Sequence, residues 1–63
     1  MSLNIIAVGH SDDGRVTLLI NNQKYEYECD NAVIVRFLEQ LRQRNINKGI
    51  LLNTFKQKAR VLK

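Results

Sequence analysis

The sequence predicts an α+β fold with two layers: a three-stranded antiparallel meander followed by two helices packed on one face of the sheet (βββαα). Two observations lead to this prediction. Residues 5–29 contain three runs of β-forming residues separated by turn sequences, and residues 30–62 contain two apolar stripes with helical spacing. The chain has 63 residues, so residues 1–63 are expected to form a single small α+β domain with a small core.

The first two strands are expected over residues 5–10 and 15–20, joined by a loop that ends in Gly14. The length of this loop matters because the side chains of a strand alternate between the two faces of a sheet. A three-residue loop with a left-handed Gly14 places Ile6 and Val8 on the apolar face of the second strand, whereas a two- or four-residue loop places them on the other face. The alternation of side chains between the two faces and the presence of Gly14 both favour the three-residue loop.

The third strand is expected over residues 24–29, where charged residues alternate with Tyr25, Tyr27 and Cys29. A two-residue turn at Asn21-Asn22 agrees with this alternation, because it pairs the apolar face of the second strand with the two tyrosines. The predicted core face of the sheet consists of Ile6, Val8, Val16, Leu18, Ile20, Tyr25, Tyr27 and Cys29.

The first helix is expected to begin after Asp30, a residue type that favours the N-cap position, and to end near Asn45. Its apolar stripe consists of Ile34, Phe37, Leu38 and Leu41. A second helix is expected over residues 50–60, with a stripe of Leu52, Phe55, Ala59 and Leu62.

The charge of the chain is unevenly distributed. Residues 1–39 hold three cations and six acids, whereas residues 40–63 hold seven cations and no acid, and the net charge is +4. Such a cluster is either a solvated helix surface or a contact surface for a polyanion. The candidate nucleic-acid-binding residues are Arg42, Arg44, Lys48, Lys56, Lys58 and Arg60.

The sequence gives no sign of catalysis. His10 and Cys29 lie on the first and third strands, about 10 Å apart across two strand spacings, which is too far for a nucleophile and its base. Asp12 and Asp13 form a turn, and the chain has no phosphate-binding glycine loop or metal-ligand spacing. We therefore expect no catalytic residue, no metal ligand, no cofactor and no small-molecule substrate.

The sequence also points to a compartment. The start of the chain lacks the charge and apolar run of a signal peptide, and no apolar stretch is long enough to cross a membrane. One unpaired cysteine fits a reducing environment, so we expect a cytoplasmic protein with no membrane partner.

Two further features have alternative interpretations. Tyr25 and Tyr27 can pack in the core, or they can stack on bases if their sheet face is open. The opposite sheet face would expose Ile5, Ala7, Thr17 and Leu19, which form either a homodimer contact or a modest exposed surface.

The chain resembles the KTSC domain, a module of similar size found at the C-terminus of some lysyl-tRNA synthetases and as free-standing bacterial proteins. The resemblance rests on Tyr25-Glu26-Tyr27, which matches the central Tyr-x-Tyr of that family, with support from Val8-Gly9, Phe37-Leu38, Lys48-Gly49 and Asn53. No proline follows the tyrosine strand, and residues 50–52 are aliphatic where the family has aromatic residues. The resemblance implies a domain without catalytic activity and a role in RNA binding.

The charge distribution and the resemblance together predict a small non-catalytic binding module that contacts the phosphate backbone of RNA, or of DNA, through its basic helical half. The alternative is a protein–protein interaction module or small homodimer that uses the outer face of the sheet.

Overall fold

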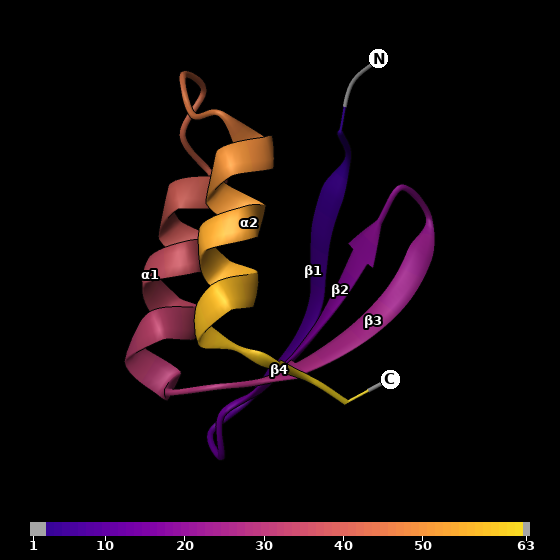
Figure 1. The fold of residues 1–63 in the computed structure, drawn as a ribbon, viewed down its shortest axis with the longest axis vertical. Coiled ribbons are helices and arrows are strands. Elements are labelled where there is room, and N and C mark those ends of the chain that lie inside the picture. The colour runs from indigo at the N-terminus through magenta and orange to yellow at the C-terminus, as the bar shows by residue number, and fades with distance from the viewer. Residues whose placement is uncertain (1–2, 63) are drawn as a thin grey trace.

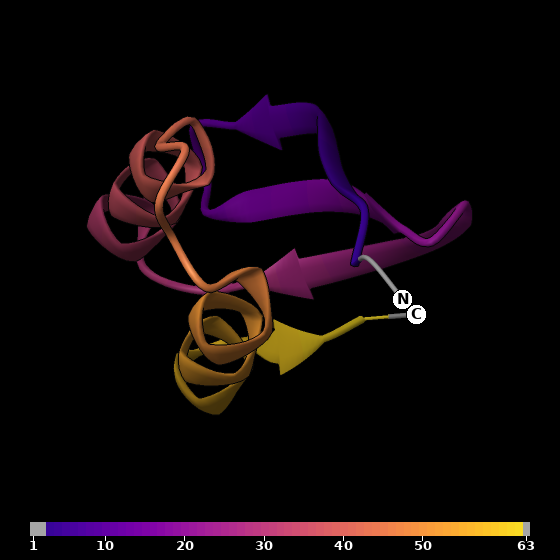
Figure 2. The same ribbon diagram turned by 90° about the horizontal axis from the view of Figure 1, so that it is seen from above.

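The computed structural model describes residues 3–62 and confirms the predicted fold of three antiparallel strands followed by two helices (Figure 1). The elements are β1 (Ile5–Ser11), β2 (Arg15–Ile20), β3 (Gln23–Glu28), α1 (Asn31–Leu41), α2 (Lys48–Lys58) and a short β4 (Arg60–Val61). The strands form one antiparallel sheet in the order β1-β2-β3-β4. The two helices lie side by side against one face of this sheet (Figures 1 and 2).

The β2–β3 hairpin has the predicted two-residue turn. Asn21 and Asn22 adopt positive φ angles of 52° and 70°, a conformation that asparagine tolerates better than most residues. Leu18 therefore pairs with Tyr25, and the predicted register is confirmed.

The β1–β2 hairpin has the predicted three-residue loop, but its register differs from the prediction. Ser11 pairs with Arg15, and Gly14 has a φ of 87°, as the loop requires. A β-bulge between Ala7 and Gly9 then inserts one residue into β1, and each residue before the bulge moves to the opposite face. The placement of Ile6 and Val8 in the core is therefore wrong: their side chains are 45% and 53% exposed.

The core lies between the helices and the sheet. Its buried residues are Ile5, Val16, Leu18, Tyr27, Ile34, Phe37, Leu51, Leu52 and Phe55. Phe55 connects the layers, because its ring stacks on Phe37 at a centroid distance of 4.2 Å and meets the edge of Tyr27 at 5.5 Å. The predicted stripe of α1 is confirmed, since Leu38 and Leu41 pack against this core beside the buried members.

The first helix begins after Asp30 as predicted, whereas the other three helix ends differ from their predicted positions. Asp30 occupies the N-cap of α1, but its side chain makes no capping hydrogen bond, and the helix ends at Leu41. In contrast, the side chain of Asn47 caps α2 by accepting a hydrogen bond from the Ile50 N–H at 3.2 Å, so this helix starts before residue 50.

The predicted second helix extends too far at its C-terminus. Ala59 has extended backbone angles, and the chain then pairs with β3 as β4. The N–H of Leu62 donates to the carbonyl oxygen of Glu26 at 2.7 Å. If the helix continued for another turn, the backbone N–H and C=O groups along the free edge of β3 would have no strand to pair with. The chain pairs with this edge instead, so Arg60 and Leu62 lie beside the sheet and not on the helix.

Candidate nucleic-acid interface

The six predicted binding residues are all exposed, and the fold separates them into two groups at opposite ends of α2. Arg42, Arg44 and Lys48 lie where α1 ends and α2 begins, and Lys56, Lys58 and Arg60 lie where α2 ends and β4 begins. These two ends are the top and bottom of the helical layer in Figure 1. Lys48 and Lys58 begin and end the helix, so the groups are about 15 Å apart at 1.5 Å per residue.

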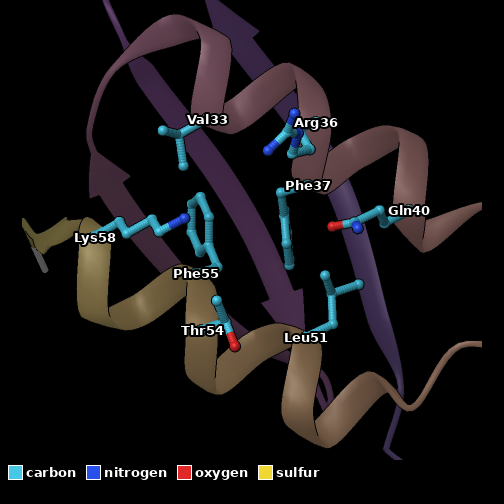
Figure 3. A pocket seen from close by; sticks show the side chains of 8 residues that line it. All are labelled: Val33, Arg36, Phe37, Gln40, Leu51, Thr54, Phe55 and Lys58. Carbon is cyan, nitrogen blue, oxygen red and sulfur yellow. The ribbon is translucent and has the colours of Figure 1, made fainter.

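Arg36 joins the second group, although it lies in the acidic half of the sequence. Arg36 on α1 and Lys58 on α2 both line a shallow groove between the helices, with Phe37 and Phe55 also lining it (Figure 3). This groove has a volume of about 40 Å³, roughly three times what one water molecule needs. The sequence places Arg36 on the polar face of α1, but only the packing of α2 against α1 makes it line the same groove as Lys58.

Arg60 differs from the other cations in its surroundings. Its Nη2 lies 4.0 Å from Oε1 of Glu28, and Nε of Arg15 lies 3.9 Å from Oε2 of the same carboxylate. These are the ion pairs found among residues 3–62, and the guanidinium-bearing side chains are 80% and 59% exposed. Exposed pairs of this kind contribute about 0–1 kcal/mol, so Glu28 partly offsets the charge of Arg60 without fixing its position.

The two tyrosines do not form an open stacking platform. Tyr27 is 3% exposed and packs against Phe55, so its face is not available to a base. Burial, with a smaller contribution from Tyr25, raises the pKa of the Tyr27 hydroxyl. Tyr25 is half-buried on the same helix-covered face, and its hydroxyl donates to Oε1 of Gln23 at 2.7 Å. Of the two interpretations, core packing is the correct one for Tyr27.

His10 and Cys29 have separate partners. His10 Nε2 and Asn31 Oδ1 are hydrogen-bonded at 2.6 Å, and the Cys29 thiol donates to the carbonyl oxygen of Asp30 at 3.6 Å. Burial raises the pKa of the Cys29 thiol, and the nearby Asp30 raises it further, so the thiol stays protonated at neutral pH.

One of the two turn acids, Asp13, also has a local partner. The hydroxyl of Ser11 donates to the Asp13 carboxylate, and this hydrogen bond lowers the pKa of Asp13. Within residues 3–62, no three His, Cys, Asp or Glu side chains come together as metal ligands would.

The outer face of the sheet, opposite the helices, is more polar than predicted. Because of the β1 bulge, Ile5 and Ala7 pair with Ile20 and Leu18 and lie on the helix-covered face, so their assignment to the outer face is wrong. Ile6 replaces them beside Leu19. The charged residues on this face are Arg15, Lys24, Glu26, Glu28 and Arg60.

Comparisons with known proteins add no relative: no family model matches the chain, and no curated protein or solved structure does so. The resemblance to the KTSC domain therefore stays a prediction. Of the helices in the described part of the chain, none has the length and apolar character required to cross a membrane.

Proposed function

We propose that the protein is a small non-catalytic module that binds RNA through its phosphate backbone, using exposed cations of the helical layer. The observation that supports this proposal is the position of Lys56 and Lys58 in the last turn of α2, in a part of the chain that contains no acid after Glu39, with Arg36 of α1 lining the same groove as Lys58. Clustered cations neutralise several phosphates at once and release the counterions bound to them.

The second group, Arg42, Arg44 and Lys48, extends this surface to the other end of α2. The 15 Å between the groups, estimated from the helical rise, corresponds to about four nucleotides at 3.4 Å per step. Neither group contains an exposed aromatic ring or a pair of side-chain amides placed to read bases, so the proposed binding is independent of base sequence.

The resemblance to the KTSC domain implies a role in RNA binding, which agrees with this proposal. The proposal itself rests on the charges alone. The proposed compartment is the cytoplasm, where the free thiol of Cys29 remains reduced.

The proposal is tested by the salt dependence of RNA binding. We expect the affinity for a labelled single-stranded RNA of mixed sequence, measured by fluorescence anisotropy, to fall steeply as salt concentration rises, with a logarithmic slope of about −0.7 per phosphate contact. The Lys56→Gln/Lys58→Gln double variant should reduce that slope by about 1.4, or about 0.7 for each contact removed.

A matched control tests whether RNA binding depends on where the cations lie or only on the net charge of the protein. The Arg15→Gln/Lys24→Gln double variant removes the same charge from the outer face of the sheet, where both side chains are exposed. We expect this variant to bind RNA with nearly the wild-type slope. Equal losses in the two double variants, or no binding by the wild type at low salt, would contradict the proposed surface.

A further inference from the structure

β1 is an open edge of the sheet, and two of its residues present unpaired backbone groups. Asn4 pairs with Asn21 through both groups: its N–H donates to Oδ1 at 3.0 Å, and its carbonyl oxygen accepts from the N–H at 2.8 Å. Because residues of an antiparallel strand alternate in the direction of their backbone groups, those of Ile5 and Ala7 point away from β2. No strand of the described chain lies beyond β1 (Figure 2).

An apolar groove lies directly beside this edge. The side chains of Ile5 and Ala7 are on the helix-covered face, and α1 forms the opposite wall. The groove has a volume of about 320 Å³ and is lined by Ile5, Ile6, Ala7, Leu38, Leu41 and Arg42. Its single charged residue is a cation, Arg42.

We propose that this edge and groove bind an extended peptide segment as an additional strand next to β1, with a carboxylate of the peptide at Arg42. A strand added to a sheet edge forms main-chain hydrogen bonds with it, and alternate side chains of that strand enter a pocket on one face. Here the free backbone groups and the groove belong to the same residues, Ile5 and Ala7. The peptide residues opposite them would therefore direct their side chains into the groove.

The lining residues favour this occupant over two others. The apolar walls offer little to a phosphate chain, which binds through cations. A second copy of the chain paired about a twofold axis would bring both grooves, and therefore two Arg42 guanidinium groups, into one interface. Because no acid lines the groove, the groove of a second copy would offer Arg42 no opposite charge, whereas an apolar peptide that carries a carboxylate does.

The proposal is tested by selecting peptides from a phage-displayed library of short random sequences. We expect the wild-type protein to enrich sequences with alternating apolar residues and an acidic residue or C-terminal carboxylate at one end. Ala7→Pro removes the outward N–H and leaves the bonds between β1 and β2 in place, because proline is tolerated on the open side of an edge strand. This variant should bind the selected peptides at least about tenfold more weakly.

The role of Arg42 has its own matched pair of variants. Arg42→Gln should weaken binding by about 1.4- to 5-fold, and only for peptides that keep the carboxylate, because an exposed ion pair contributes about 0.2–1 kcal/mol. Arg44→Gln removes the same charge from an exposed residue outside the groove and should leave peptide binding unchanged.

A second readout does not depend on the folding of any variant. N-methylation of successive peptide amides should abolish binding at every second position, because alternate amides face β1. The proposal is overturned if no sequence is enriched, if the methylation pattern lacks this alternation, or if the amide NMR shifts caused by the peptide cluster on the outer face of the sheet. Self-association through β1, detected as loss of the peptide site with rising protein concentration, would equally overturn it.

Discussion

Gly14 closes the loop between β1 and β2 in a conformation that side chains rarely adopt. Its φ is 87°, and its carbonyl oxygen accepts a hydrogen bond from the Cys29 N–H at 2.9 Å. A Cβ added here would lie 2.5 Å from the carbonyl oxygen of Cys29, so any side chain forces the loop away from the end of β3. The same atom added at Gly9 meets nothing within 4 Å.

The first prediction follows from this contrast. Gly14→Val should lower the free energy of unfolding by about 1–3 kcal/mol or more, because left-handed backbone and a close contact are combined at one position. Gly9→Ala should change it far less. Urea titrations of the two variants measure this difference, and similar losses of stability would contradict the assigned loop geometry.

A second residue-scale prediction concerns Tyr27 and pH. Burial raises the pKa of its hydroxyl in the folded protein above the ordinary value near 10, so the folded state disfavours the phenolate relative to the unfolded state. The contribution of the protonated Tyr27 hydroxyl to the free energy of unfolding is fully present below pH 10 and is lost as pH rises through the folded-state pKa. Between neutral pH and about pH 10.5, the free energy of unfolding should fall more for the wild type than for Tyr27→Phe. Parallel pH profiles of the two proteins in urea unfolding would contradict this.

Among the elements, the contact between α1 and α2 depends on one pair of rings. Phe37 is 2% exposed and stacks on Phe55, which in turn meets Tyr27 of β3. Because Phe55 touches both the other helix and the sheet, the loss of its neighbour leaves a cavity between the two layers.

We therefore predict that Phe37→Ala lowers the free energy of unfolding by about 3–5 kcal/mol. This loss is a large share of the total stability of a small domain, so little folded protein should remain. The control is Val35→Ala. Val35 is 44% exposed, so this change should alter the free energy of unfolding by no more than about 0.5 kcal/mol. A dispersed amide NMR spectrum of Phe37→Ala, like that of the wild type, would show that the core does not require this stack.

At the scale of the whole molecule, the two faces of the protein differ in character. The helical layer carries exposed cations at both ends of α2, whereas the outer face of the sheet mixes both signs of charge around Ile6 and Leu19. A stable protein interface buries about 800 Å² on each partner, one sixth of the 4782 Å² of accessible surface of this chain. On this face five charged side chains surround Ile6 and Leu19, and charged residues are depleted from the centre of stable interfaces.

The prediction at this scale is that the protein is monomeric. Sedimentation equilibrium at several concentrations should report one mass, that of a single chain, and addition of RNA should increase it. A dimer that forms with rising concentration and is indifferent to RNA would instead favour the alternative function, an interaction module that uses the outer face of the sheet.

The sequence by itself determined the order of the elements, the β2–β3 register and the left-handed Gly14. Each of these depends on local chemistry. Asn21 and Asn22 tolerate positive φ, a glycine is required where a bulged loop turns, and the α1 stripe repeats with the period of a helix. Residues adjacent in the chain supply all of this information.

Only the tertiary structure decided the bulge at Val8, the pairing of β4 with β3 and the position of Arg36 and Lys58 along one groove. A glycine inside a strand is a recognised sign of a bulge, so Gly9 was the one local signal for the first of these. The other two have no local signal, because they depend on which sheet edge lies open beside residues 60–61 and on how closely two helices pack. The candidate interface and the peptide groove both arise from contacts of this second kind, between residues far apart in the chain.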